Sequence, residues 1–143
     1  MKSEPCRRSV KAFGAVSRER DPRFHFQFSE RFNANTFLTF IKRLTKNEGR
    51  KVFLVLDNVG YHHAKLVREW TQANSNRIEL HFLPAYSPDL NPIEILWRQT
   101  KRSATHNRHF DTLQSLHHRL FRRFNRHQGN PAYLRGIVGM RSA

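Results

Sequence analysis

The chain is 143 residues long, which is enough for one domain with a hydrophobic core of its own. Its 26 Lys and Arg residues against 11 Asp and Glu residues give a formal net charge of +15, which favours polyanionic partners and above all nucleic acid. The single cysteine, Cys6, excludes an internal disulfide, and no apolar run is long enough to span a bilayer, so we expect a cytoplasmic, DNA-associated protein with no membrane partner.

The first predicted elements are two strands. Residues 1–8 are polar, follow no strand or helix pattern, and are expected to be disordered. Residues 9–16 contain enough apolar side chains for a strand, although Gly14 interrupts them. After a polar turn, residues 24–28 place phenylalanine at every second position, which is the pattern of a strand with one buried face. The two segments therefore predict an antiparallel hairpin.

The middle of the chain alternates helices with strands. Asn35 is placed to cap a helix that runs to about Asn47, and a second amphipathic helix is expected over residues 63–74. Between them, residues 52–56 (VFLVL) form a short apolar run typical of a fully buried strand in a parallel sheet. Residues 78–83 alternate more weakly as a further strand. This alternation predicts an α/β sheet with the hairpin at one edge.

The last part of the chain is predicted to be helical. A proline-rich loop, residues 84–92, leads into a helix that ends near Arg102. A final helix, capped by Asp111, closes a single domain over residues 9–126. Residues 127–143 follow as a C-terminal tail whose structure the sequence leaves open.

One carboxylate, Asp57, comes directly after the buried strand. Ligands of open α/β sheets bind outside the carboxyl ends of the strands, so Asp57 stands where a functional side chain is expected. Asp is also an ordinary N-cap residue, and on this stretch alone a cap of the following helix explains it equally well.

A second carboxylate, Glu94, lies in the first turn of the helix after the proline-rich loop. Asn91 fits the N-cap, Pro92 the first helical position and Glu94 the capping-box position, which is a sufficient structural explanation. The functional alternative pairs Glu94 with Asp57. Mg²⁺ prefers carboxylate oxygens and substrate phosphates as ligands, and two such ions support phosphoryl transfer.

Two motifs carry a resemblance to a known family. The first is Leu56-Asp57-Asn58-Val-Gly-Tyr-His62, and the second, LPAYSPDLNPIEILW, runs from Leu83 to Trp97. They resemble the D-N-x-x-x-H and Y-S-P-x-L-N-P-I-E-x-x-W motifs of DDE transposases of mariner type, in the branch found in bacterial insertion sequences. The resemblance covers about residues 9–110.

This resemblance implies a ribonuclease H-like fold, a mixed α/β sheet with flanking helices. It implies that Asp57 and Glu94 are the second and third catalytic carboxylates, which bind two Mg²⁺ or Mn²⁺ ions. Water would cleave the transposon end, and the freed 3′ hydroxyl would attack target DNA. Asn58, His62 and Asn91 belong to the motifs without an assigned role. A histidine such as His62 more often orients a neighbour or satisfies a backbone group than it binds metal.

The family's first catalytic Asp has no counterpart in this sequence. It belongs to the first and central strand of the family fold, which precedes the hairpin. Without that strand, both neighbouring strands have unpaired backbone edges, and the metal site lacks one ligand. We therefore expect a truncated transposase catalytic domain that is inactive alone. An upstream transposase fragment, joined by a frameshift or associating in trans, would restore the enzyme, and a homodimer is a further expected partnership.

Three basic residues, Arg98, Lys101 and Arg102, follow Glu94 along the predicted helix. They are candidates for contacts with DNA phosphates, although a solvated basic face explains them equally well. One rival hypothesis for the chain is a non-catalytic basic remnant that holds DNA without reading its sequence. Affinity that falls steeply with salt but ignores Mg²⁺ would favour that remnant. A pseudogene product without function is the other rival.

Overall fold

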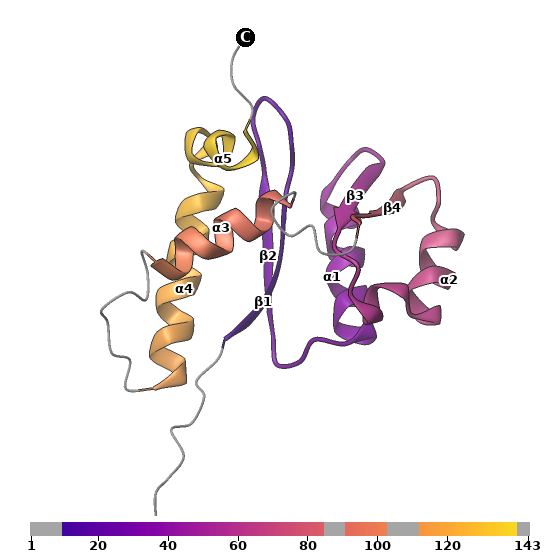
Figure 1. Ribbon diagram of the computed structural model, residues 1–143, viewed down its shortest axis with the longest axis horizontal. Helices are drawn as coiled ribbons and strands as arrows, with labels where there is room; N and C mark the ends of the chain where they lie inside the picture. The colour runs from indigo at the N-terminus through magenta and orange to yellow at the C-terminus, as the bar shows by residue number, and fades with distance from the viewer. Residues whose placement is uncertain (1–9, 85–90, 103–111, 140–143) are drawn as a thin grey trace, which may run out of the picture.

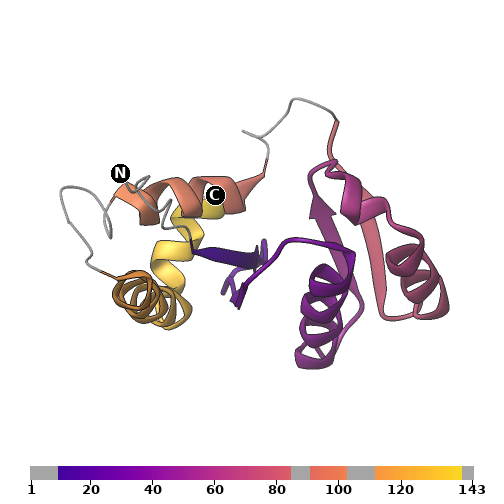
Figure 2. The same cartoon turned by 90° about the horizontal axis from the view of Figure 1, so that it is seen from below.

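The structure is a computed structural model that describes residues 10–84, 91–102 and 112–139. A central hairpin separates two groups of elements, with three helices on one side and the other strands and helices on the other (Figures 1 and 2). The predicted disorder of residues 1–8 and the predicted cap Asp111 lie outside the described residues, as does most of the proline-rich loop.

The predicted hairpin is confirmed. Strands β1 (Lys11–Val16) and β2 (Phe24–Ser29) pair antiparallel, with Val16 opposite Phe24 next to the turn. Three helices pack beside them: α3 (Pro92–Thr100), α4 (Leu113–Gln128) and α5 (Pro131–Val138). Together they bury one of the two cores of the protein, formed by Phe24, Ile93, Leu96, Phe124, Leu134 and Ile137.

The C-terminal helices differ from the prediction in two respects. The N-cap of α4 is Thr112, not Asp111, because the Thr112 hydroxyl accepts a hydrogen bond from the Ser115 N–H at 3.0 Å. Helix α5 occupies part of the tail that the sequence left open. Its Leu134 is fully buried, so part of the predicted tail, residues 127–143, packs into the core beside the hairpin.

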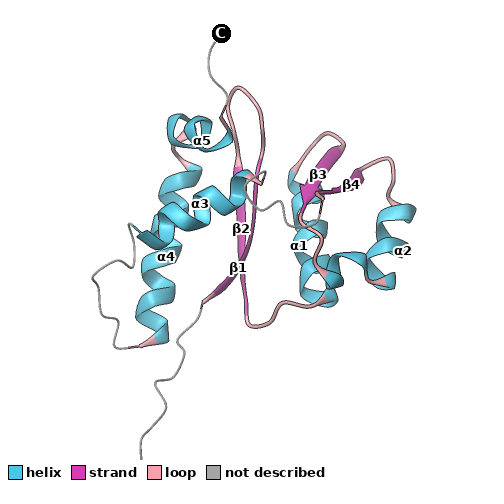
Figure 3. Ribbon diagram, in the orientation of Figure 1, coloured by secondary structure: helices cyan, strands magenta, loops and turns pink. Residues whose placement is uncertain are grey.

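The other group of elements is a second, parallel half-sheet with two helices. Strands β3 (Val52–Leu56) and β4 (Ile78–Phe82) pair in parallel, as predicted. Helices α1 (Ala34–Asn47) and α2 (Lys65–Ala73) pack with them in the second core (Figure 3). The N-cap of α1 is Asn33 rather than the predicted Asn35, because Asn33 forms a reciprocal capping box with Thr36.

The prediction that β3 is fully buried is wrong. Phe53 is 63% exposed and Val55 52%, whereas Leu56 on the opposite face is buried. Successive side chains of a strand point to opposite faces, and both helices of this half pack on the face of Leu54 and Leu56. The other face of β3 is open in the described part of the chain.

The four strands form two separate sheets, β1 with β2 and β3 with β4. A ribonuclease H-like sheet without its central strand is expected to divide in this way. Among the described residues, no strand lies between β1 and β3. The molecule is therefore two half-sheets that side chains, rather than strand pairing, hold together.

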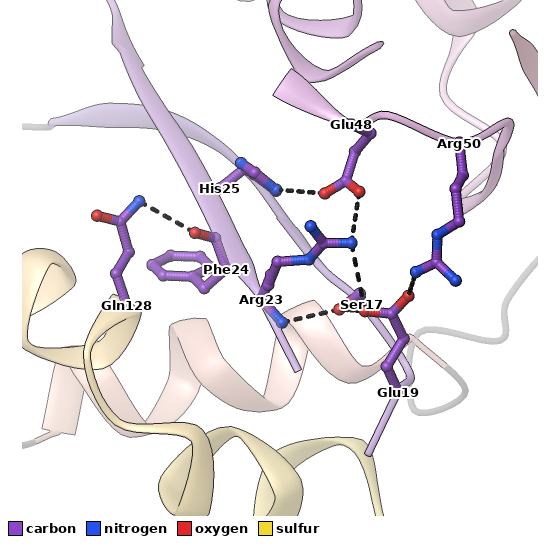
Figure 4. Close-up of polar contacts among 8 residues, drawn as sticks. All are labelled: Ser17, Glu19, Arg23, Phe24, His25, Glu48, Arg50 and Gln128. Carbon is purple, nitrogen blue, oxygen red and sulfur yellow. Dashed lines mark hydrogen bonds and ion pairs between the residues drawn. The ribbon is translucent and has the colours of Figure 1, made fainter. Parts of the chain in front are cut away.

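An ion network ties the halves at the hairpin turn (Figure 4). The Glu48 carboxylate, at the end of α1, lies 2.6 Å from Arg23 Nη2 and 2.9 Å from His25 Nε2. Glu19 in the turn forms a second ion pair with Arg50, which precedes β3. The Glu48 side chain is only 12% exposed, so solvent screens this pair less than an ordinary surface pair.

Aromatic rings tie the halves at the other end of β1. Phe13 is 7% exposed and stacks on Phe40 of α1 with ring centroids 5.5 Å apart. It also meets Tyr61, which follows β3, at 6.5 Å. The two ends of the junction are therefore fixed by different forces, charge at one and apolar packing at the other.

Gly14 decides how closely β1 can approach α3. A Cβ at this position would lie 2.4 Å from Cζ2 of Trp97 and 3.2 Å from Cδ1 of Ile93. Only a residue without a side chain therefore allows the Trp97 ring to lie against the strand. Gly14, which interrupts the apolar pattern of the strand, therefore allows α3, the helix that carries Glu94, to pack closely on β1.

We predict that Gly14→Ala lowers the free energy of unfolding by about 1–3 kcal/mol, because the packed Trp97 ring must move. The matched control is Gly136→Ala in α5, where a Cβ meets nothing within 4 Å and helix propensity favours alanine. Urea denaturation of both variants measures the difference. Equal stability of Gly14→Ala and the unsubstituted protein would contradict the close approach.

His127 makes the α3–α4–α5 group sensitive to acid. Its ring stacks on Tyr133 at 4.4 Å and lies 3.3 Å from the Thr100 hydroxyl. Burial, with the nearby charges of Arg123 and Arg126, lowers its pKa to about 4. The unfolded chain therefore binds a proton at higher pH than the folded one does, and stability is lost as the pH falls from 6.5 toward 4.

We predict that lowering the pH from 6.5 toward 4 reduces the free energy of unfolding by about 2–3 kcal/mol. The variant His127→Phe should remove most of this loss. Denaturant unfolding at pH 7, 5.5 and 4.5 measures it. The control is His118→Gln, an exposed histidine of the same helix, which should keep the original pH dependence. The same acid sensitivity in His127→Phe would show that another group causes it.

Candidate metal and DNA site

Asp57 follows the last residue of β3, with its side chain half-exposed at the carboxyl end of the strand. His62, 7% exposed in the short 3₁₀ helix η1 (Gly60–His63), holds this strand end. Its Nδ1–H donates a hydrogen bond to the Asp57 carbonyl oxygen at 2.9 Å, and its ring lies 4.3 Å from that of Phe37. These contacts suit a residue that orients its neighbour.

Burial also lowers the pKa of His62, with the Asp57 backbone contact and charge acting in the opposite direction. The imidazole is therefore neutral at neutral pH. Its Nδ1 lies 3.5 Å from Asp57 Oδ1, but this approach is a contact of a neutral ring and not an ion pair. Asn58, the next motif residue, uses its side-chain oxygen to contact His63 Nε2.

Glu94 is placed by the N-terminus of α3. The buried Asn91 caps this helix, accepting a hydrogen bond from the Ile93 N–H at 3.3 Å, and Pro92 occupies the first position. The Asn91 cap and Pro92 therefore account for the start of α3 and place Glu94 in its first turn.

The two carboxylates border one cavity of about 1030 Å³ between the half-sheets. Burial raises the pKa of Glu94, the Asp57 charge raises it further, and the Arg98 charge opposes both. Side chains from a strand end and a helix N-terminus, far apart in the sequence, thus line the same cavity, and the charge of Asp57 acts on Glu94.

The pair offers oxygen ligands of the kind that Mg²⁺ and Mn²⁺ accept. Within residues 10–84, 91–102 and 112–139, no group of three or more His, Cys, Asp or Glu residues could hold a metal ion. The Nδ1 of His62 already serves the Asp57 backbone. Two carboxylates fit an ion that takes its other ligands from water or a phosphate, and they hold it weakly.

Of the predicted DNA contacts, Arg98 is exposed one helical turn after Glu94, and its charge opposes the rise in the pKa of Glu94. Lys101 and Arg102 are exposed just beyond the end of α3. Tyr61 is a site residue that the sequence analysis did not single out. It lines the same cavity, and burial together with the Asp57 charge raises its pKa. Its place inside the D-N-x-x-x-H motif was the available signal.

None of the described helices is both long and apolar enough to cross a membrane.

Comparison with known proteins gives a consistent family. Residues 1–117 match the family model described as DDE superfamily endonuclease. The transposable element Tcb2 transposase of Caenorhabditis briggsae is 35% identical over 48% of this chain and 26% of its own length. The insertion element IS630 uncharacterized 39 kDa protein of Shigella sonnei is 27% identical over 56% of this chain and 24% of its own. The chain thus spans about a quarter of the length of these relatives.

Two solved structures share the fold. The Mos1 transposase paired-end complex with left transposon end aligns with a TM-score of 0.63 at 22% identity, over 96% of this chain and 46% of that one. The Mos1 transposase catalytic domain with Raltegravir and Mg aligns with a TM-score of 0.57 at 18% identity, over 91% of this chain and 80% of that one. Identities this low show the fold alone.

We predict that Asp57→Asn lowers the pKa of Glu94, because it removes the negative charge that disfavours ionisation of the second carboxyl. Burial remains, so the pKa should fall only part of the way to its ordinary value. The raised pKa also means that stability falls as the pH rises through the interval above 4.5, and Asp57→Asn should narrow that interval.

Titration of the Glu94 side-chain carboxyl by ¹³C NMR measures this shift. Glu79→Gln, which removes an exposed carboxylate on β4, is the matched control and should leave the Glu94 pKa unchanged. An unchanged pKa in Asp57→Asn would mean that the two carboxylates are too far apart to share a cation.

Proposed function

Because the chain belongs to the DDE superfamily endonucleases, as a transposase of the mariner and IS630 type, we propose that it carries part of a metal-dependent site for DNA strand cleavage and strand transfer. Asp57 and Glu94 are the two carboxylates of that site. The observation that supports them is their electrostatic coupling across one shared cavity. The proposed ions are Mg²⁺ or Mn²⁺, and the proposed partner is DNA.

The residues around the pair act by holding it in place. His62 fixes the backbone at Asp57, and the first turn of α3 fixes Glu94. Held together, the carboxylates repel each other, and a bound divalent cation relieves that repulsion. When bound, such ions activate a water or hydroxyl nucleophile and stabilise the leaving oxygen of a phosphodiester. Because protons compete for the same oxygens, metal binding should strengthen as the pH rises.

We propose further that this chain by itself does not cleave DNA. The described residues offer two acidic ligands and no third, and the resemblance assigns the missing one to a strand that precedes the hairpin. A cation held by two carboxylates is less firmly positioned than one held by three, so the nucleophile is poorly activated.

A non-catalytic DNA-binding remnant is the second candidate function. The net charge of +15 and the exposed Arg98, Lys101 and Arg102 favour it. Such a protein would hold phosphate backbones through counterion release, with an affinity that falls steeply with salt. Its affinity would be the same with and without Mg²⁺ and in Asp57→Asn, which separates it from the metal-site proposal.

We predict that Mn²⁺ selectively broadens the NMR signals of residues next to Asp57 and Glu94, and that Asp57→Asn weakens this binding at least about tenfold, as loss of a ligand does. We also predict that the chain with Mg²⁺ leaves a transposon-end duplex uncut. Glu79→Gln is the control for both assays.

Each half of this prediction can fail separately. Equal Mn²⁺ broadening of the NMR signals in Asp57→Asn and in the unsubstituted protein would show that Asp57 does not bind the ion. Nicking by the purified chain that Asp57→Asn abolishes would contradict the proposed inactivity and leave the metal site standing.

A further inference from the structure

β1 and β3 each have one edge without a strand partner in the described residues. β1 pairs only with β2, and β3 pairs only with β4. The N–H and C=O groups along such an edge are a template for pairing with another extended chain. The protein therefore has two strand edges, one on β1 and one on β3, with which an extended chain can pair.

Both edges border the same cavity. Its lining includes every residue from 12 to 16 of β1 and every residue from 52 to 56 of β3. Side chains of a strand alternate between its two faces, so a lining of consecutive residues follows the backbone edge and not one face. The cavity thus runs between the two edges, where the two half-sheets stand apart (Figures 1 and 2).

The contacts at the two ends give the strand directions. Glu19, just after β1, pairs with Arg50, just before β3, while Phe13 in the first half of β1 meets Tyr61, beyond the end of β3. β1 and β3 therefore run in opposite directions. A strand between them that is antiparallel to β1 is parallel to β3, as β4 already is. Its carboxyl end then lies beside Asp57.

Helices flank both faces of β1 beside this space. Phe13 packs with α1, and the next residue, Gly14, meets Trp97 of α3. Successive residues of a strand face opposite sides, so α1 and α3 lie on opposite faces of β1. A strand inserted beside β1 would have apolar surroundings above and below, from Phe40 on one face and Ile93 on the other. Because both of its faces would be buried against apolar side chains, the inserted strand must itself be apolar on both faces.

We propose that the cavity between β1 and β3 is an acceptor site for one extended apolar β-strand from a second transposase polypeptide. The strand lies antiparallel to β1 and parallel to β3 and completes a single sheet. The match leaves a fifth of the Mos1 catalytic domain uncovered, so that transposase polypeptide has chain beyond the part with which this protein aligns. An acidic residue at its carboxyl end adds a ligand beside Asp57 and Glu94, a detail that rests on the proposed function.

The test uses a strand of known behaviour as the probe. The peptide KVFLVLDN, the sequence of residues 51–58, has a core that is apolar on both faces and carries an aspartate just before its last residue, and two added lysines keep it soluble. The full chain is mixed with it in EDTA, and amide hydrogen exchange is followed. We expect exchange to slow at least tenfold at alternate residues of β1 and β3, with smaller changes in β2 and β4.

Two controls make this result specific. A peptide with proline in place of its central leucine cannot pair on both edges and should leave exchange unchanged. In the protein, Ala15→Lys places a long charged side chain in the cavity and should abolish binding. The matched variant Ala73→Lys, at the exposed end of α2, should bind normally.

Three results would overturn the proposal. The first is the absence of binding at millimolar peptide. The second is binding that protects the exposed face of Phe53 and Val55 and not the two edges. The third is protection of both edges without peptide, in a monomer or a dimer, because the chain would then fill the site itself.

A metal titration separates this proposal from the proposed function. With Mn²⁺ in place of EDTA, the peptide should raise the affinity of the protein for Mn²⁺ at least tenfold, and the same peptide with Asn in place of its aspartate should not. If both peptides bind but neither changes the affinity for Mn²⁺, the acceptor site is supported and the proposed metal site is contradicted.

Discussion

Within the described residues, β1 and β3 each have one backbone edge without a strand partner, and this is the constraint on which the rest of the structure depends. A buried N–H or C=O group without a partner is costly, so two facing edges cannot simply be packed together. The protein instead holds them apart with an ion network around Glu48 at one end and the ring of Phe13 at the other. The cavity is what this arrangement leaves, and both carboxylates stand on its border.

The carboxylate pair is an unfavourable arrangement for folding that is useful for binding. Asp57 raises the pKa of Glu94, so ionising both groups works against stability at neutral pH. Side chains that cost stability persist where the surrounding structure fixes them, here through His62 on one side and the Asn91 cap on the other. A divalent cation, or a third ligand that brings one, would turn this repulsion into binding energy.

Local signals in the sequence predicted most elements, but they missed one helix cap, one exposed strand face and one close packing contact. The alternating phenylalanines predicted the hairpin, and the apolar stripe of α1 predicted the helix. The cap of α1 is Asn33 because Asn33 and Thr36 each accept a hydrogen bond from the backbone N–H of the other. The exposed face of β3 was not predictable, because a run of apolar side chains does not tell whether one face or both will be covered. The role of Gly14 depends on Trp97, which lies on a helix much later in the chain.

The sequence by itself determined the family and the identity of the candidate acidic residues, because short motifs keep the chemical groups of a site in order along the chain. Only the tertiary structure decided that Asp57 and Glu94 border one cavity, that the sheet is divided there, and that His62 serves the backbone of Asp57. The cavity and the divided sheet relate residues remote in sequence, which the packing of helices on each half-sheet brings into place, and no local pattern encodes them.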